Sequence, residues 1–346
     1  MAQDKARIAI LGATGYTGVE LLRLLDHHPR IDVAALTADR HAGKPIAAVF
    51  PHLVHRSLPD LVKIDDVDFG ALDGVFCCLP AGMTQDLIGG WPRGPKIVDF
   101  SADFRLRDPA VYEEAYGRPH SALETQKEAV YGLSELARGP LKSAWLVANP
   151  GCHTTTAQLP LKPLLAAGAI DPDEIIIDTK TGISGAGRSL REDLLFCESN
   201  EGCKAYGIGF HRHMPELQQG LDEACGRPVA FSFTPHLLPL DRGILATIYV
   251  RLSHGRSLGD LRNILFDTYR DEAFVHLCDQ APAVQHVRGT NLCLMSVHGD
   301  RRPGHAIIIS VIDNLLKGAS GQALQNMNIV LGFEEGTGLP RTALLP

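Results

Sequence analysis

Residues 7–18, RIAILGATGYTG, decide the expected fold of the amino-terminal half. The first five form a short apolar run suited to a strand buried on both faces, and the glycine turn leads into the amphipathic stretch 19–28, VELLRLLDHH. In such a unit Gly12 makes the tight turn, Gly15 lets backbone approach a pyrophosphate, and Gly18 permits close packing. The free N–H groups at the helix start would face the phosphates. The stretch therefore predicts a dinucleotide-binding unit, although its spacing is G-x-x-G-x-x-G rather than G-x-G-x-x-G.

Strand-like runs continue on the carboxyl side of this unit. Residues 31–39 close the first strand-helix-strand unit, and similar runs at 74–80, 96–104 and 144–149 are separated by helix-length segments. This rhythm predicts an α/β fold with a Rossmann-type doubly wound parallel sheet. Residues 150–313 contain several strand-like runs with few crossover helices, which predicts a second, α+β domain with a mixed or antiparallel sheet.

The end of the second strand is where the adenosine ribose would bind. Asp39 lies about 20 residues beyond Gly18, where an acidic residue that bonds a ribose 2'-hydroxyl indicates NAD. Arg40 follows directly, and Lys44 and the Thr37 hydroxyl are near, which is a set suited to a 2'-phosphate. We therefore expect NADP rather than NAD.

Composition excludes several classes of partner. The 346 residues carry 33 Lys plus Arg against 40 Asp plus Glu with no basic run, so nucleic acid is not an expected partner. No apolar stretch approaches the roughly 20 residues of a membrane helix, and we expect a cytoplasmic protein. The spacing of Cys197, Cys203, His211 and His213 does not fit the close pairs of structural zinc sites, so no metal is expected.

Cys152 is the expected nucleophile among the eight cysteines. It follows the strand-like run AWLVAN and the pair Pro150-Gly151, and a helix is expected to begin beside it. A helix amino terminus favours a thiolate, which can form a thioester or thiohemiacetal that exchanges hydride with a nicotinamide. His211 is the expected acid/base, with His213 and Tyr206 near the substrate.

Two arginines are candidates for binding an acidic substrate. Arg105 stands just past a strand end in DFSADFRL, where a bidentate contact with a carboxylate is natural. Arg188 ends the segment TGISGAGR, whose glycines would also permit close approach of backbone to the nicotinamide, although a flexible surface loop is an alternative.

The ordered set GATGYTG, DFSADFRL, ANPGC, SGAGR, HRHMPE and NLLKGASGQALQN resembles the N-acetyl-gamma-glutamyl-phosphate reductases of arginine biosynthesis, within the aspartate-semialdehyde dehydrogenase-like superfamily. The likeness covers nearly the whole chain. It implies that Cys152 is the nucleophile, His211 the acid/base and Arg105 the ligand of the substrate carboxylate. It also implies that the helix after Asn314 returns to the dinucleotide domain.

The expected domains are therefore 1–149 with 314–346, which bind the dinucleotide, and 150–313, which carries catalysis and oligomerisation as a dimer or tetramer. Contacts with NADP are expected from Gly12, Thr14, Gly15, Tyr16, Thr17, Gly18, Thr37, Arg40, Pro80, Ser184, Gly185 and Asn314.

The expected reaction is the NADPH-dependent reduction of N-acetyl-L-glutamyl 5-phosphate to the 5-semialdehyde and phosphate through a cysteine thioester. One alternative keeps this chemistry on an aminoadipyl or aspartyl phosphate, because one methylene is worth only about 1 to 3 kcal/mol in a pocket. Another is a dinucleotide-sensing protein without turnover, since a fold does not entail a function.

Overall fold

The computed structural model describes residues 5–91 and 93–345, and the chain forms two compact units. The first unit runs to Pro150 and includes Ala319–Leu339; the second comprises Gly151–Gly318 and the segment from Pro340. The sequence placed everything after residue 313 in the first unit. The last segment belongs to the second because its backbone is bonded there: Asn291 N–H donates to Pro340 O at 3.0 Å, and Leu344 N–H donates to Arg288 O at 3.1 Å.

The first unit is built on a fully parallel sheet. Its strands, in spatial order, are β3 (Leu61–Val62), β2 (Ile31–Thr37), β1 (Ala6–Leu11), β4 (Gly74–Cys77), β5 (Lys96–Asp99), β7 (Leu146–Ala148) and β6 (Val130–Tyr131). The chain changes direction across the sheet between β1 and β4, which is where ligands bind in such folds. Residues 8–11 of β1 are fully buried, as expected of a strand covered on both faces.

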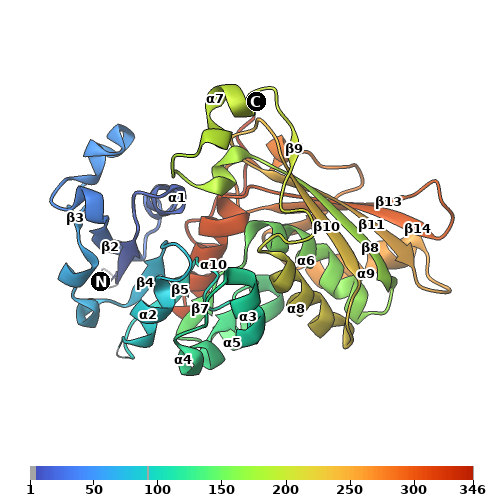
Figure 1. Ribbon diagram of the computed structural model, residues 1–346, viewed down its shortest axis with the longest axis horizontal. Helices are drawn as coiled ribbons and strands as arrows, with labels where there is room; N and C mark the ends of the chain where they lie inside the picture. The colour runs from blue at the N-terminus through green and yellow to red at the C-terminus, as the bar shows by residue number, and fades with distance from the viewer. Residues whose placement is uncertain (1–4, 92, 346) are drawn as a thin grey trace. The chain divides into compact units, whose positions relative to one another are not determined.

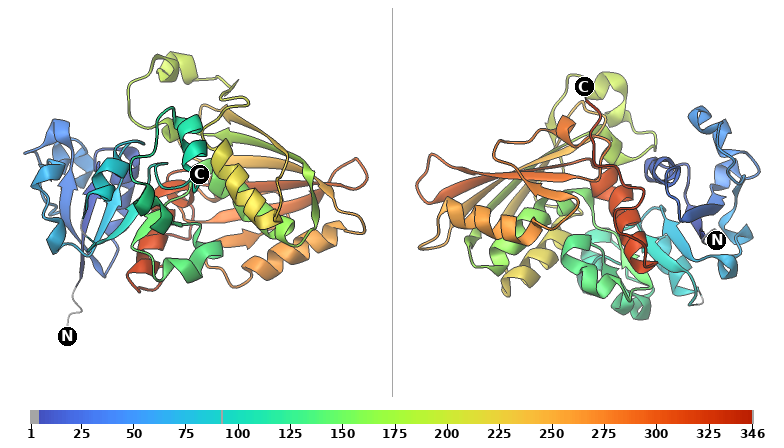
Figure 2. Two further views of the ribbon diagram at one scale, coloured as in Figure 1. Left: turned by 60° about the horizontal axis from the view of Figure 1, so that its bottom comes forward. Right: turned by 180° about the vertical axis from the view of Figure 1, so that it is seen from behind.

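The helices of this unit are α1 (Tyr16–Leu25), α2 (Thr84–Gly89), α3 (Pro109–Tyr116), α4 (Leu123–Glu128), α5 (Ser134–Leu141) and α10 (Gly321–Val330), counted over its described residues. Helix α10 packs against β5, α5 and α1 although it comes from the far end of the chain (Figure 2, red). All its residues are buried, and Asn326 Nδ2 donates to Gly132 O at 2.8 Å and Asn149 Oδ1 at 3.1 Å. These bonds explain how an amide-rich helix can sit in a core.

The second unit contains a mixed seven-stranded sheet. Its strands, in spatial order, are β12 (Val275–Leu277), β13 (Cys293–Gly299), β14 (His305–Ile312), β11 (Ile244–Leu252), β8 (Ile170–Thr181), β10 (Phe231–Leu237) and β9 (Lys204–Ala205). The pairs β12–β13 and β8–β10 are parallel, and the others are antiparallel. The long strands lie side by side in Figure 1. The predicted mixed sheet is confirmed.

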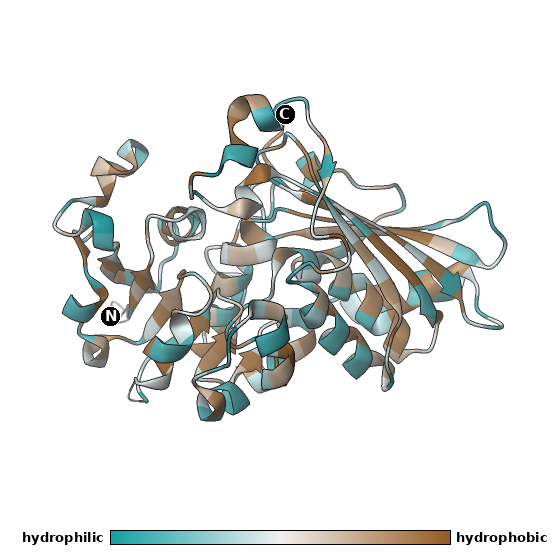
Figure 3. Ribbon diagram, in the orientation of Figure 1, coloured by the Kyte–Doolittle hydropathy of each residue, from teal (hydrophilic) through white to brown (hydrophobic). Residues whose placement is uncertain are grey.

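In the described part of this unit the sheet is accompanied by α6 (Cys152–Ala166), α7 (Phe196–Ser199), α8 (Met214–Cys225) and α9 (Leu258–Tyr269). Helix α6 packs on β8, β11 and β14, α9 packs on β12 and β13, and α8 packs against α6. Buried and less buried residues alternate along β11 and β14, and brown hydrophobic bands run across these strands in Figure 3. One face of the sheet is therefore covered by helices, and the register of the strands decides which side chains reach it.

Across residues 5–91 and 93–345, no helix combines the length and the apolar character that crossing a membrane requires.

Candidate active site

The thiol of Cys152 lies at the first residue of α6, as the sequence predicted. Gly151 is the N-cap in an extended conformation, and the side chain of Cys152 is only partly buried. Thr156 Oγ1 donates to the Cys152 carbonyl at 2.8 Å, which closes the first turn. The sulfur therefore lies at the positive end of the helix dipole, which favours the thiolate.

Gly318 packs directly against this cysteine. A Cβ built on Gly318 would lie 2.7 Å from Cys152 Cβ and 3.2 Å from its Cα. Ordinary carbon contacts are about 3.5 to 4.0 Å, so only glycine fits. The first glycine in KGASG therefore allows the chain to pack against the cysteine of the second unit.

Glu216 fixes the start of the cysteine-bearing helix, and the sequence analysis missed it. It is 2% exposed, and its Oε1 accepts from Gly151 N–H at 2.8 Å and from Thr154 Oγ1 at 2.7 Å. In return Gln158 Nε2 donates to the Glu216 carbonyl at 3.0 Å. A buried carboxylate at a helix amino terminus is stabilised by the N–H groups it accepts from. The only signal in the sequence was its place in HRHMPE, five residues after His211.

His211 stands just before α8. His213 N–H donates to His211 Nδ1 at 3.0 Å, and the two ring centroids are 4.9 Å apart. Burial lowers the pKa of His211 to about 4, with the Arg212 charge as a second cause and Glu216 opposing. The ring is therefore neutral at pH 7, and because Nδ1 accepts, its proton is assigned to Nε2.

Tyr206 lies beside His211 and near the cysteine. The centroids of the Tyr206 and His211 rings are 5.4 Å apart. Burial raises the pKa of Tyr206, and the charge of Cys152 is the second cause. Its Oη lies 3.0 Å from Nε2 of His153, the residue that follows Cys152 in α6. Gly207, with φ +58°, makes the turn possible, since a Cβ there would lie 3.0 Å from His211 Cδ2.

His153 joins this group without having been predicted. It is 3% exposed, its Nε2 is 3.0 Å from Tyr206 Oη, and its Nδ1 is 3.0 Å from Thr179 Oγ1. Its ring lies 5.5 Å from His211 and 5.6 Å from His213 between centroids. The second unit thus gathers Cys152 and three neighbouring histidines with a tyrosine.

Asn314 forms hydrogen bonds with Ser184, which lies in the predicted segment TGISGAGR, and with the backbone of Gly243. Its Nδ2 donates to Ser184 Oγ at 3.0 Å, and its Oδ1 accepts from Gly243 N–H at 2.7 Å. A Cβ on Gly185 would lie 3.7 Å from Asn314 Nδ2. Arg188 is exposed, directly after a glycine with φ +79°. The structure therefore brings Ser184, Gly185 and Asn314 together and leaves Arg188 on the surface of its unit.

In the first unit, the glycine turn has the shape that a dinucleotide requires. Gly12 has φ +76°, and a Cβ there would lie 2.6 Å from Cys78 O; a Cβ on Gly18 would lie 2.7 Å from Ala13 Cα. Gly15 is the N-cap of α1, and a Cβ there would meet only Gly12 O, at 3.5 Å. Two of the glycines therefore close the turn, and the third leaves space before the helix N–H groups.

The remaining predicted cofactor residues of the first unit differ in burial and in their contacts. Thr37 is 1% exposed, and its Oγ1 accepts from Gly12 N–H at 3.1 Å, so its hydroxyl supports the turn from below. Arg40 is exposed on a short 3₁₀ turn after β2, and Pro80 is exposed after β4. Tyr16 is exposed at the first residue of α1, while Thr14 and Thr17 are partly buried.

Arg105 is buried in the loop after β5 of the first unit, and its Nη2 donates to Phe100 O at 2.7 Å. The loop is held by Asp103, which was not predicted. Both carboxylate oxygens of Asp103 accept from Gly82 N–H at 2.7 Å, and Tyr112 Oη donates at 2.7 Å. The guanidinium therefore sits on a backbone that has little freedom to move.

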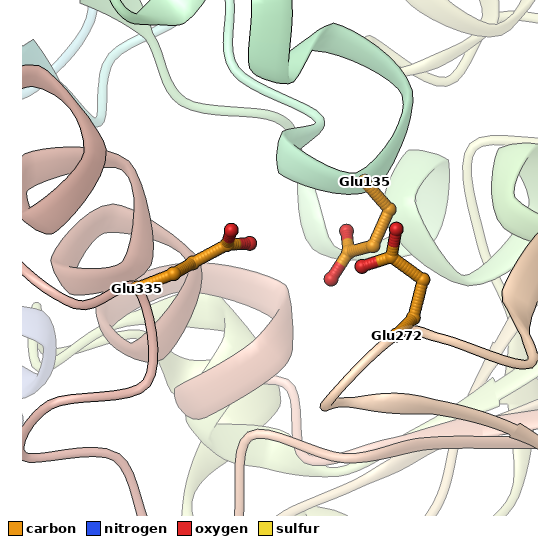
Figure 4. A group of neighbouring side chains, drawn as sticks. All are labelled: Glu135, Glu272 and Glu335. Carbon is orange, nitrogen blue, oxygen red and sulfur yellow. The ribbon is translucent and has the colours of Figure 1, made fainter.

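Figure 4 draws two acidic residues of the first unit, Glu135 and Glu335, with Glu272 of the second. Gln325 Nε2 donates to Glu135 at 2.9 Å and to Glu335 at 2.8 Å, and Arg138 pairs with Glu335 at 2.7 Å. The charge of Glu335 is thus balanced by an arginine, and the two carboxylates help to join α5 to the segment after α10.

Comparison with known proteins identifies the family. A model of the semialdehyde dehydrogenase NAD-binding domain matches residues 7–144, and a model of the semialdehyde dehydrogenase dimerisation domain matches residues 152–314. An N-acetyl-gamma-glutamyl-phosphate reductase of Rhodospirillum rubrum is 56% identical and is aligned over 99% of both chains. A probable chloroplastic N-acetyl-gamma-glutamyl-phosphate reductase of Arabidopsis thaliana is 55% identical over 98% of this chain and 85% of its own. The chain belongs to the N-acetyl-gamma-glutamyl-phosphate reductase family.

Solved structures agree on the fold. Aspartate semialdehyde dehydrogenase II of Vibrio cholerae, in a complex with ASA, has a TM-score of 0.70 at 17% identity and covers 95% of this chain and 99% of its own. Aspartate semialdehyde dehydrogenase of Candida albicans with NADP has a TM-score of 0.67 at 18% identity, with the same coverage. The predictions of the Rossmann-type fold, of the family and of an oxidoreductase with a nicotinamide cofactor are confirmed.

Proposed function

We propose that this chain reduces N-acetyl-L-glutamyl 5-phosphate to N-acetyl-L-glutamate 5-semialdehyde and phosphate, with NADPH as the reductant, in arginine biosynthesis. The observation that carries the proposal is the group in the second unit: a cysteine at a helix start anchored by Glu216, followed in the helix by His153, whose ring contacts Tyr206 and His211. A dinucleotide sensor would need the turn of the first unit and none of these residues.

Several residues of the chain fit NADPH. The turn Gly12–Gly18 and the start of α1 would hold the pyrophosphate, because a side chain at Gly12 or Gly18 would collide with backbone while Gly15 is open. Arg40 would meet the 2'-phosphate, which favours NADPH over NADH. Ser184, Gly185 and Asn314, held together in the second unit, would contact the nicotinamide end. Bound NADPH supplies the hydride of the reaction.

The chain's own part in the reaction centres on Cys152. Its thiolate attacks the carbonyl carbon of the acyl phosphate, and the carbonyl electrons move to the oxygen. Collapse of this oxyanion expels phosphate and leaves a thioester on the sulfur. After hydride addition, the thiohemiacetal oxyanion collapses to the aldehyde and returns the electron pair to sulfur as thiolate.

His211 would be the acid/base of these steps and would also donate a hydrogen bond to the carbonyl oxygen of the substrate. In the resting enzyme its ring is neutral with the proton on Nε2, so its first role is to donate a hydrogen bond to the developing oxyanion. To accept a proton at Nε2, the ring must first release the bond from His213 N–H. His213 and Tyr206 would lie at the substrate, and Arg105 would bind its carboxylate, with Arg188 as a second cation.

The test compares substrates and variants in one assay. The protein is given NADP, phosphate and, in turn, the semialdehydes of N-acetylglutamate, N-acetyl-aminoadipate and aspartate, and NADPH formation is followed. We expect the acetylglutamate derivative to have the highest kcat/KM by at least tenfold, and Cys152→Ser to abolish turnover of it. Equal rates with a longer or shorter chain would reassign the substrate, and full activity of Cys152→Ser would remove the thioester mechanism.

We also propose that the chain forms a homo-oligomer through the sheet face opposite α6. Ile176, Tyr249 and Ile307 lie in one row across β8, β11 and β14, and Ile176 is 49% exposed. A two-fold dimer would bring this apolar row against the same row of a second copy, and the matched domain model is described as a dimerisation domain. Sedimentation of Ile176→Glu should give a smaller particle than the wild type; an unchanged mass would reject this face.

We place the protein in the cytoplasm. The structure pairs none of the eight cysteines in a disulfide, which is usual for proteins of a reducing compartment. Fractionation of the native host should recover the enzyme with cytosolic markers.

A further inference from the structure

The buried histidine next to the nucleophile links two hydroxyl groups. His153 follows Cys152 in α6 and bonds Thr179 of β8 through Nδ1 and Tyr206 through Nε2, each at 3.0 Å. Of these three side chains only Tyr206 is partly exposed. The geometry alone leaves the direction of both bonds open, because each hydroxyl can donate or accept.

The surroundings of Thr179 decide the direction. Its side chain is completely buried, and within the part of the chain that the structure describes, His153 is the sole partner of its hydroxyl. If Thr179 accepted from Nδ1–H, its own proton would be buried without an acceptor, at a cost of roughly 1 to 3 kcal/mol. If Thr179 donates to Nδ1, only lone pairs remain, which proteins tolerate better. Thr179 is therefore the donor.

The direction of the Thr179 bond also determines the direction of the bond between His153 and Tyr206. Burial is the main cause that holds the pKa of His153 well below its ordinary value, and the neighbouring rings of His213 and His211 also disfavour a positive charge on it, so the ring carries one proton. With Nδ1 accepting, that proton is on Nε2, and Nε2–H donates to Tyr206 Oη. No other partner of this hydroxyl is found in residues 5–91 and 93–345, so its proton points away from His153.

We propose that Thr179 and His153 are positioning residues that fix Tyr206 as a hydrogen-bond donor beside Cys152, aimed at the oxygen of the reacting carbonyl. The identity of that oxygen rests on the proposed function. The direction of the hydrogen bonds from Thr179 through His153 to Tyr206 is independent of it. Tyr206 and His211 Nε2–H then form two donors for one developing negative charge. A donor that is already oriented costs no reorganisation during the reaction.

The first experiment reads the tautomer directly, without substrate. The protein is labelled with ¹⁵N-histidine, and the His153 ring is assigned by its loss in His153→Gln. We expect the wild-type ring to be neutral at pH 7.5 with the proton on Nε2. A proton on Nδ1 would reverse the relay, make Tyr206 an acceptor and overturn the proposal, whatever the enzyme's substrate proves to be.

The second experiment is a double-mutant cycle on turnover. We expect Tyr206→Phe and His153→Phe each to lower kcat by about 10 to 100-fold, since loss of one oxyanion donor can cost up to about 1000-fold. The double variant should lie within about threefold of Tyr206→Phe, because His153 acts through the tyrosine. Multiplicative losses would contradict that relation.

Two variants keep the test decisive if His153→Phe folds poorly. The amide of His153→Gln can still donate at the position of Nε2, so this variant should retain activity within about fivefold. Thr179→Val keeps the volume and removes the donor, so it should lower kcat about tenfold in the wild type and not in Tyr206→Phe. The exposed His276 of β12 provides a control, and His276→Gln should change kcat less than twofold. Equal losses for His153→Gln and His153→Phe would mean that packing alone matters.

Discussion

Replacing Gly318 by alanine tests how the carboxyl-terminal glycine segment supports the nucleophile. The added Cβ would lie 2.7 Å from Cys152 Cβ, against a normal carbon contact of about 3.5 to 4.0 Å. One group must therefore move by about 1 Å. Gly318 lies in the π-turn Leu316–Ser320 and is buried, so the new methyl group cannot turn into solvent.

The expected losses follow from this displacement. Overpacking of a buried site costs about 1 to 3 kcal/mol of the free energy of unfolding. A reactive group misplaced by about 1 Å can lower turnover by about 100-fold. We therefore expect Gly318→Ala to lower kcat/KM about 100-fold. The assay is run at a temperature where the variant stays folded, so unfolding cannot account for this loss.

The assay combines NADPH formation with the rate at which iodoacetamide alkylates Cys152, which reports the thiol without turnover. Gly139 supplies the matched control, because it lies exposed in α5 and a Cβ there meets nothing within 4 Å. Gly139→Ala should keep full activity and a normal rate of Cys152 alkylation. Activity and alkylation of Gly318→Ala within twofold of the wild type would refute the packing argument.

Three further predictions concern the groups around the two sites. Glu216→Gln replaces an acceptor of two bonds by an amide, so we expect a loss of about 1 to 3 kcal/mol in urea unfolding together with slower thiol alkylation; Glu223→Gln on the same helix should change either by little. Because the folded-state pKa of His211 is about 4, against 6.5 for the ordinary group, His211 stabilises the fold above pH 6.5, and this contribution of up to about 3 kcal/mol is lost as the pH falls from 6.5 to 4. The slope of unfolding free energy against pH should therefore be shallower in His211→Asn, and an identical slope would contradict the burial. Arg40→Ala should raise KM for NADPH about tenfold or more and leave KM for NADH unchanged, with Lys63→Ala as a control; an equal effect on both cofactors would place Arg40 away from the 2'-phosphate.

The sequence predicted the features that depend on local pattern. The apolar run 7–11, the glycine turn and the helix behind it follow from residue types and their period, and the structure has β1, the turn and α1 there. Cys152 at the start of α6 was predicted for the same reason. These elements are decided by neighbours in the chain.

The features that the sequence did not predict depend on contacts between distant residues. Glu216 meets Gly151 across 65 positions, and Thr179 meets His153 across 26. No local period marks such a pair, and an isolated histidine beside a cysteine is not distinctive. The buried amides of α10 were equally hidden, because their partners lie near residues 132 and 149.

The central claim is that Cys152 carries the acyl group. It is tested most directly by mixing the enzyme with NADP and N-acetylglutamate semialdehyde in the absence of phosphate, followed by acid quenching and mass analysis of the peptide that contains Cys152. We expect a burst of one NADPH per subunit, an acetylglutamyl thioester on that peptide, and release of the adduct when phosphate is added. A burst with the adduct on another residue, or steady turnover in Cys152→Ser, would contradict the account.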